Sequence, residues 1–559
     1  MRPVTLEWLL LLLVPLLVDA HAQSAFVLLG STGDNAYRPA GVWTGLFEAW
    51  CNGILQQPMT DLHVQVNQGH TEKEIHDKVM ATLEPFYATL QGDKSFQCRL
   101  SSGDCQPETF FQEARLNIWK GQGRYNASGQ AANMSYLASY DTVTAYMSLP
   151  PSAYADWVES MVAYWGGSDK VHIAFEKPFG GGRDSLQAAQ DLYSNIVKAG
   201  LKKENFHLTD HWLSFFMNEH LPTFRGILES KLGINFTTDV TKIVVTEYEQ
   251  RGFDGRGAFI DGLGQVRDMV QSHLLQVLAL TMLPPASVTS RAKLEIFQHL
   301  SVANCELKQF DGMLESKKLS FHSAFADSTF ARVYLNSSMP AWRDVELVIQ
   351  TGKAMDINLY TVELFQRDGP GLITIDIGME EVGIGDVKVS QWPLKDLRPF
   401  QAPLPGFQSN SSVSMTPSVS KAGSGFVLRY AGDSLYFPKP YSRIVRALLV
   451  GEYSAAFVTW EECERSWQIV TGSSPSVCLD PSPESVTVYI PSFLCDKPAP
   501  EFCEQHVTVQ DQYDVKYKCT PEHDAWYGGV DLYKAKCHGG QWDAEALPVR
   551  RPSAVALVV

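Results

Sequence analysis

The stretch AFVLLGSTGDNA, residues 25–36, decides the fold. Residues 25–29 form an apolar run of the length of a buried strand, and Gly30 and Gly33 follow it at once. A helix-compatible stretch then continues to Trp50. Strand, glycine-rich turn and helix open a dinucleotide-binding βαβ unit, in which the glycines let backbone N–H groups approach a pyrophosphate. The spacing is G-x-x-G rather than G-x-G-x-x-G, so a tight strand–helix turn explains the glycines about as well.

Alternating strands and helices continue this pattern. Further strands are expected at residues 62–66, 142–149 and 171–175, with a helix at 153–164 before the last of them. This alternation predicts a parallel sheet, and hence an α/β Rossmann-type domain. After residue 206 the expected strands follow one another with few helices between them, at 242–248, 331–335, 346–351, 361–365 and 372–377. The second half is therefore predicted to be an α+β domain with a large, mostly antiparallel sheet.

The beginning of the chain is typical of a secretory signal peptide. Arg2 precedes an apolar run at residues 9–18, and an A-x-A cleavage pattern follows at Ala20-His21-Ala22. The run is too short to span a bilayer, although an uncleaved anchor or a buried strand is the alternative. No later stretch has the length and apolarity of a membrane span. We expect a signal peptide at 1–22, a dinucleotide-binding domain at 23–205, a substrate domain at 206–477 and a disulfide-rich tail at 478–559.

Charge, cysteines and sequons limit the partners and the compartment. The formal net charge of the 559 residues is -16 without any dense basic run, which argues against nucleic acid or an anionic membrane as partner. None of the ten cysteines has a zinc spacing, so disulfides are favoured and no metal is predicted. With the signal peptide, the favoured disulfides and five Asn-x-Ser/Thr sequons predict a glycoprotein that is secreted or held in the endoplasmic reticulum lumen. The sequons lie at Asn126, Asn133, Asn235, Asn336 and Asn410.

Two motifs in the first half could carry chemistry. Residues 176–180 read E-K-P-F-G at the end of an apolar strand, and a buried lysine there is costly unless it is paired or contacts a ligand. A solvated Glu–Lys pair is the alternative. Asp210 and His211 are adjacent, and could orient a base and bind a phosphate, or be a helix cap beside a surface histidine.

Two more motifs lie in the second half. A strong helix is expected at residues 265–282, stopped by Pro284-Pro285, and His273 falls on its apolar stripe. A hydrogen-bonded core histidine is the plainer interpretation of that position. Lys353 follows a strand end, where a solvated loop lysine is the plainer interpretation.

In this order the motifs resemble the glucose-6-phosphate dehydrogenase family, and are most similar to its endoplasmic-reticulum form. The blocks E-K-P-F-G and R-D-x-x-Q-x-H are specific when they occur together. The matching stretches are G-x-x-G-D-x-A at 30–36, Leu149-Pro150-Pro151, residues 176–180, Asp210-His211, Arg267-Asp268 with residues 273–276, and Gly352-Lys353-Ala354.

The resemblance implies an oxidation at C1 of a hexose or hexose 6-phosphate, with NADP or NAD as cofactor and the preference open. It implies that His273 takes the proton of the anomeric hydroxyl and that Asp210 orients this histidine. The implied substrate contacts are Lys177, His211, Glu249, Asp268 and Lys353. The implied cofactor contacts are Gly30, Ser31, Gly33, Asp34 and Lys177.

The sequence also departs from the family pattern. The family's D-H-Y-L-G-K-E reads D-H-W-L-S-F-F at 210–216, so Phe215 replaces a phosphate-binding lysine, and Asn358 stands at a second cationic position. Losing two charge-assisted contacts weakens phosphate binding by about two to four orders of magnitude. The substrate could therefore be an unphosphorylated sugar, and the other alternative is a non-catalytic secreted glycoprotein with a matrix or binding role. The lactonase domain of the endoplasmic-reticulum form is not expected, the tail resembles a sushi-type module without its usual final cysteine, and the oligomeric state, a homo-oligomer included, stays open.

Overall fold

A computed structural model of the chain divides into two compact units. Unit 1 comprises Met1–Gly180, Gln187–Phe215 and Asp433–Trp460, and unit 2 comprises Gly181–Leu186, Phe216–Gly432 and Glu461–Val559. None of the helices in the described part of the chain is long and apolar enough to cross a membrane. The predicted signal peptide lies outside the described residues. These are residues 24–31, 34–37, 41–55, 60–66, 71–92, 96–100, 103–113, 117–120, 127–177, 179–180, 185–250, 263–285, 289–310, 328–355, 357–378, 387–392, 401–403, 412–420, 423–431, 439–450, 457–472, 478, 486–489, 495–498, 506–508, 514–518, 532–538 and 541–545.

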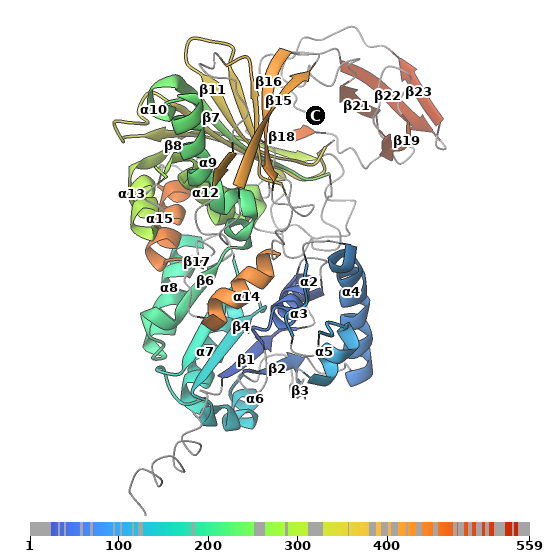
Figure 1. The fold of residues 1–559 in the computed structure, drawn as a ribbon, viewed down its shortest axis with the longest axis vertical. Helices are drawn as coiled ribbons and strands as arrows, with labels where there is room; N and C mark the ends of the chain where they lie inside the picture. The colour runs from blue at the N-terminus through green and yellow to red at the C-terminus, as the bar shows by residue number, and fades with distance from the viewer. Residues whose placement is uncertain are drawn as a thin grey trace, which may run out of the picture. The chain divides into compact units, whose positions relative to one another are not determined.

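Unit 1 is built on a twisted parallel sheet of strand order β17-β6-β5-β4-β1-β2-β3 (Figure 1). All neighbouring strands are parallel except β17, which pairs antiparallel with β6. The order 3-2-1-4-5-6 is that of a Rossmann-type domain and confirms the α/β prediction. The strands are β1 (Ser24–Leu29), β2 (Thr60–Val66), β3 (Asn117–Lys120), β4 (Thr142–Met147), β5 (Val171–Phe175), β6 (Phe206–Thr209) and β17 (Phe457–Val458).

The helix expected directly after the glycine turn is two helices, α2 (Asp34–Tyr37) and α3 (Val42–Cys51). The sequence between them contains Pro39, which lacks the N–H that a continuing helix needs. All the residues of α3 are buried, and its aromatic and aliphatic side chains form much of the core of this unit. The other helices of unit 1 are α4 (Glu72–Gly92), α5 (Pro107–Glu113), α6 (Ala127–Asn133), α7 (Tyr154–Tyr164), α8 (Ser185–Lys198) and α14 (Pro440–Val450).

Helix α14 comes from the last quarter of the chain but lies beside α3 in unit 1, as its orange colour among the blue elements of Figure 1 makes plain. The approach is close at Gly45 of α3. A Cβ atom on Gly45 would lie 2.6 Å from the carbonyl carbon of Tyr441. The absence of a side chain at this position lets α14 reach the sheet edge where the candidate site begins.

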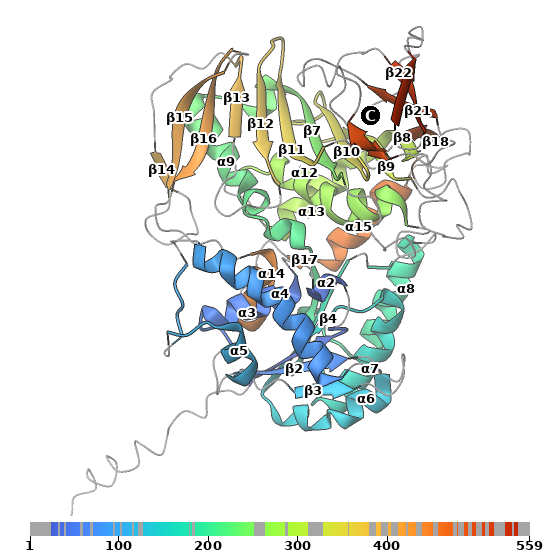
Figure 2. The ribbon, with the colours of Figure 1, turned by 90° about the vertical axis from the view of Figure 1, so that its right-hand side faces the viewer.

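Unit 2 contains a large sheet of strand order β14-β15-β16-β13-β12-β11-β7-β10-β9-β8-β18 (Figure 2). Its pairs are antiparallel except β10 with β7 and β18 with β8, which confirms the prediction of a mostly antiparallel sheet. The strands are β7 (Val240–Tyr248), β8 (Leu300–Phe310), β9 (Phe330–Ser337), β10 (Glu346–Gly352), β11 (Leu359–Gln366), β12 (Leu372–Asp376), β13 (Val387–Ser390), β14 (Gln401–Pro403), β15 (Ser412–Ser420), β16 (Gly423–Ala431) and β18 (Val486–Tyr489).

The helices of unit 2 pack on this sheet and on one another. The helix expected at 265–282 is a π-helix over Val266–Leu274 that continues as α12 (Leu275–Met282). A π-turn shifts the side chains that follow it and is frequent at functional sites. The other helices are α9 (Phe216–Leu232), α10 (Phe236–Asp239), α13 (Ser290–His299) and α15 (Trp460–Thr471), and the small strands of the tail are β19 (Cys495–Pro498), β20 (His506–Thr508), β21 (Asp514–Lys518), β22 (Leu532–His538) and β23 (Gln541–Glu545).

Cysteine pairs occur within each unit. A disulfide joins Cys98 to Cys105 in unit 1, and another joins Cys305 of β8 to Cys478 in unit 2. The two cysteines of the first disulfide are only 7 positions apart along the chain. Among the described residues Cys51 and Cys463 are buried and form no disulfide.

Candidate functional site

A buried ion pair lies at the carboxyl ends of β5 and β6 in unit 1. The Lys177 ammonium lies 3.1 Å from Oδ2 of Asp210, and the two side chains are 4% and 0% exposed. The lysine of the E-K-P-F-G motif is therefore paired with Asp210 rather than solvated beside Glu176. Parallel strands end at the same edge of a sheet, which is where ligands of such domains bind.

Three tyrosines hold the neighbouring residue Glu176. Its carboxylate accepts hydrogen bonds from the hydroxyls of Tyr146 and of Tyr441, the second at 3.0 Å, and its backbone oxygen accepts one from Tyr154 at 3.2 Å. Burial, and then the charge of Glu176, raises the pKa of Tyr146 and of Tyr154, so both phenols keep the protons that they donate. This network fixes the turn from which Lys177 projects.

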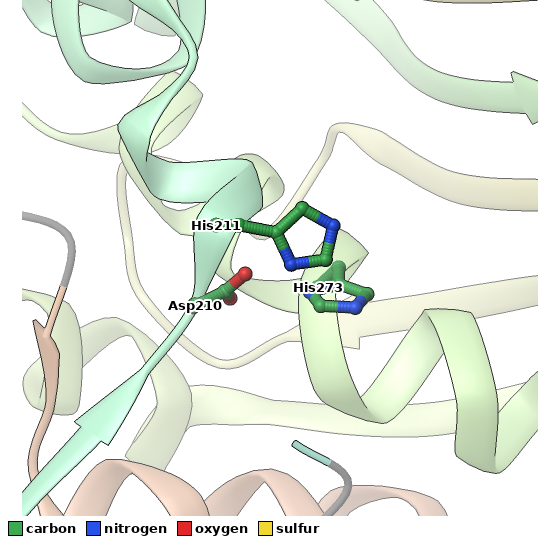
Figure 3. Close-up of side chains that lie close together, drawn as sticks. All are labelled: Asp210, His211 and His273. Atoms are coloured by element: carbon green, nitrogen blue, oxygen red, sulfur yellow. The ribbon is translucent and has the colours of Figure 1, made fainter. Parts of the chain in front are cut away.

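Asp210 also caps the short 3-10 helix His211–Ser214, because its Oδ1 accepts the Trp212 N–H at 3.0 Å. The two oxygens of the carboxylate thus have different partners, a backbone N–H and the ammonium of Lys177. The His211 ring stacks on Tyr441 with a centroid distance of 5.7 Å and an interplanar angle of 18°. Figure 3 shows Asp210 and His211 side by side where β6 passes into this turn.

Phe215, at the position of the family's lysine, is 4% exposed. Its ring lies 5.4 Å from that of Trp212. A guanidinium lies on the same turn, because Nη1 of Arg443 donates to the Ser214 carbonyl at 3.1 Å. Arg443 belongs to α14 and is 229 positions away along the chain, so no local sequence signal points to it.

The start of the glycine turn after β1, at Gly30 and Ser31, packs closely against the neighbouring strands. Gly30 has a φ of +74°, and a Cβ there would lie 2.2 Å from the Ser148 carbonyl oxygen at the end of β4. The N–H of Gly30 donates to Oε1 of Gln65 at 3.2 Å, and the Ser31 hydroxyl donates to the Gln65 carbonyl at 2.9 Å. The turn lies between β2 and β4, at the point where the strand order reverses. Gly33 and the side chain of Asp34 lie outside the described residues.

A second group of the predicted substrate contacts comes together within unit 2. Lys353 is 3% exposed on its side chain and forms an ion pair with Glu249. Burial lowers the pKa of Lys353, but Glu249, Glu247 and Asp268 together raise it, so the ammonium keeps its charge at neutral pH. Asp268 is half-buried on the π-helix.

The backbone also fixes this ion pair. The Glu249 N–H donates to the Gly352 carbonyl at 2.9 Å, and the Met355 N–H donates to the Glu249 carbonyl at 2.9 Å. Asn358, at the second position where a cation is expected, accepts the Gln250 N–H at 2.8 Å and donates to the Gln250 side chain at 3.1 Å. The amide at this position therefore ties two chain segments together beside the ion pair.

The predicted base, His273, lies at the end of the π-helix of unit 2 and is 6% exposed (Figure 3). Asp210 belongs to unit 1, so their pairing stays a prediction. Of the sequons, Asn133, Asn235 and Asn336 are exposed, whereas Asn126 and Asn410 lie outside the described residues.

Comparisons with known proteins agree with this arrangement. Residues 27–217 match the family model of the glucose-6-phosphate dehydrogenase NAD binding domain, and residues 235–477 match that of the glucose-6-phosphate dehydrogenase C-terminal domain. Glucose-6-phosphate 1-dehydrogenase of Saccharomyces cerevisiae is 26% identical over 81% of this chain and 88% of its own length. Glucose-6-phosphate 1-dehydrogenase of Cyberlindnera jadinii is 27% identical over 58% of this chain and 66% of its own length.

Solved structures share the fold. Glucose-6-phosphate 1-dehydrogenase of Mycobacterium avium superposes with a TM-score of 0.61 at 21% identity, covering 84% of this chain and 94% of that protein. A glucose-6-phosphate dehydrogenase in complex with its substrate glucose-6-phosphate also gives a TM-score of 0.61, at 19% identity and the same coverage. Unit 1 is thus built on an NAD-binding domain, and the two matched domains with their buried Lys177–Asp210 and Lys353–Glu249 pairs identify the chain as a diverged member of the glucose-6-phosphate dehydrogenase family.

Proposed function

We propose that this protein oxidises C1 of a hexose or hexose 6-phosphate, glucose 6-phosphate first among them, with NADP or NAD. The observation that carries the proposal is the buried Lys177–Asp210 pair at the carboxyl ends of β5 and β6. Two charges are retained in a dry site only where good geometry and further hydrogen bonds compensate their desolvation. Here the Asp210 carboxylate has both, since the Trp212 N–H donates a hydrogen bond to its second oxygen.

The cofactor would lie at the glycine turn after β1. When bound, its nicotinamide ring accepts a hydride. Gly30 lets the chain turn tightly beside Ser148. Gln65 accepts hydrogen bonds from the Gly30 N–H and from the Ser31 hydroxyl. Lys177, which leaves the end of β5, would lie between the cofactor and the sugar.

In the proposed reaction His273 accepts the O1–H proton while the C1–H bond breaks and its electron pair leaves as hydride. The C1–O1 bond becomes a carbonyl, and the product is a lactone. Asp210 would orient the imidazole and compensate the imidazolium that forms. Glu249, Asp268 and Lys353 of unit 2 would bind the sugar hydroxyls, and His211 would lie at its 6-position.

We further propose that the chain enters the secretory pathway and is glycosylated. Support comes from the signal-peptide pattern at residues 1–22 and from the exposure of Asn133, Asn235 and Asn336. Expression in an animal cell line, followed by enzymatic removal of N-glycans, tests this. A glycosylated protein that begins near Gln23 is expected, whereas an unglycosylated protein in the cytosol would refute it.

The activity is tested by following NADP and NAD reduction with glucose 6-phosphate and with glucose. Removing a general base lowers kcat by about two to four orders of magnitude, so His273→Asn should do this without a comparable rise in KM. His220→Asn is the matched control, because His220 is another buried histidine of unit 2 and has no proposed role. No reduction with either sugar, or equal kcat values for the two variants, would refute the proposal.

A further inference from the structure

Unit 2 contains a buried carboxyl group, Glu247, that the proposed reaction does not use. Glu247 lies on β7, is 0% exposed and pairs in register with Thr351 of the parallel strand β10. Side chains alternate along strands, so Glu247 and Glu249 share one face, and Thr351 and Lys353 share one face of the neighbouring chain. The Glu247 carboxyl group therefore lies on the same face as the Lys353–Glu249 pair, two residues further into the sheet.

One oxygen of Glu247 is held by a directed chain of hydrogen bonds. Nε2 of Gln265 donates to Oγ1 of Thr351 at 2.8 Å, and the Thr351 hydroxyl donates to Oε2 of Glu247. Because the hydroxyl oxygen already accepts the amide hydrogen, its own hydrogen is directed at the carboxyl group. The other oxygen, Oε1, is buried and has no hydrogen-bond partner among the described residues.

The charges around Glu247 do not balance. Lys353 follows β10, Glu249 follows β7 and Asp268 faces the group from the π-helix, while Tyr360 of β11 pairs with it in register. Among the described groups that act on Glu247, an ionised Glu247 would give three carboxylates for one ammonium, and a protonated Glu247 gives two. Burial above all raises the pKa of Glu247 to about 8, and Glu249 and Asp268 add to the rise while Lys353 and Thr351 oppose it.

We propose that Glu247 is a positioning residue of the sugar site. Its protonated carboxyl group does not compete for the Lys353 ammonium, which therefore binds Glu249 and the substrate. This inference rests on the proposed function, in which Lys353 and Glu249 bind the sugar. When Glu247 loses its proton, a second carboxylate competes for the ammonium and draws it away from the sugar hydroxyls. The loss falls on binding, because the proton and hydride transfers involve other groups.

Steady-state kinetics of the full chain across a pH range centred on about 8 test this. The KM for the sugar should rise about tenfold as Glu247 ionises, the effect of weakening one charge-assisted hydrogen bond, while kcat changes less than about twofold. Glu247→Gln should keep the low KM at every pH. Glu363→Gln, a change in another buried carboxyl group of the same sheet, is the matched control and should keep the wild-type rise.

A second variant separates positioning from packing. The Thr351 hydroxyl stabilises the ionised form of Glu247, so Thr351→Val should move the rise in KM to higher pH. If Glu247→Gln keeps the wild-type rise in KM, or if Thr351→Val leaves its midpoint unchanged, the proposal is wrong.

Infrared difference spectra provide a readout that needs no turnover. The full chain at neutral pH should show the carbonyl stretch of a protonated carboxyl group, and Glu247→Gln should lack it. Absence of that band from the wild type would overturn the proposal even in an active enzyme. A chain that reduces neither cofactor but has the band would instead refute the proposed function and leave the protonation of Glu247 in place.

Discussion

The replacement Lys177→Met tests the ion pair on which the candidate site depends. Methionine has nearly the length of lysine and fills its space without a charge. The Asp210 carboxylate, 0% exposed, would keep the Trp212 N–H as a hydrogen-bond partner but lose the ammonium that now lies 3.1 Å from its Oδ2. The variant therefore buries a carboxylate without its counter-ion.

The magnitude follows from the burial of both partners. Removing one member of a buried ion pair costs about 3–5 kcal/mol, because the remaining charge stays desolvated. Replacing both members by uncharged groups is often nearly neutral. Lys177→Met should therefore lower the free energy of unfolding by about 3 kcal/mol or more, and the double variant with Asp210→Asn should be less destabilised than Lys177→Met alone.

Urea unfolding of the full chain, followed by tryptophan fluorescence, measures this, since Trp212 lies in the turn that Asp210 caps. Lys73→Ala is the control: Lys73 and Asp77 form an exposed pair at 2.7 Å, and its loss should leave the unfolding midpoint unchanged. A loss below about 1 kcal/mol in Lys177→Met, or additive losses in the double variant, would refute the reasoning.

Three further changes have expected outcomes. Gly30→Ala puts a Cβ 2.2 Å from the Ser148 carbonyl oxygen at a φ of +74°, so it should cost about 1–3 kcal/mol and abolish the rise in Tm with NADP in thermal-shift assays. Glu247 keeps its proton up to about pH 8 in the folded state but loses it near 4.5 when unfolded, so the contribution of this group to the free energy of unfolding should fall by about 1.4 kcal/mol per pH unit between these values. Urea titrations at several pH values measure that slope, and Glu247→Gln should lack it. Tyr441→Phe removes the donor that lies 3.0 Å from the Glu176 carboxylate and should cost about 1 kcal/mol in the same urea assay; an unchanged midpoint would contradict this.

Much of the fold could be predicted because its signals are local. The apolar run at 171–175 is the strand β5, and the run at 25–29 lies within β1. Both strands are buried, so their hydrophobic patterns leave little choice of structure. The π-turn within the helix at 265–282 could not be predicted, because an apolar stripe cannot distinguish a π-turn from regular α-helix over so short a length.

Contacts that are distant in sequence could not be predicted. Tyr441 and Arg443 reach the turn of His211–Ser214 from the far end of the chain, and no nearby pattern marks them. Glu247 did have a signal, since it interrupts an apolar strand and precedes Glu249 by two residues. That spacing places both carboxyl groups on one face, which indicates a charged cluster once the strand is recognised.

These contacts hold the turn that follows Asp210 without the side chain of residue 215. The turn of His211–Ser214 is held by the Asp210 cap at its start and by Arg443 on the Ser214 carbonyl at its end. Neither contact uses the side chain of residue 215. Phe215 can therefore replace a lysine without moving the Asp210 carboxylate, whereas a change at Lys177 would disturb it directly. In the proposed reaction, recognition of the sugar's 6-position and support of the proton transfer would consequently be separable, and Phe215→Lys should change the preference between free and phosphorylated hexose far more than it changes kcat.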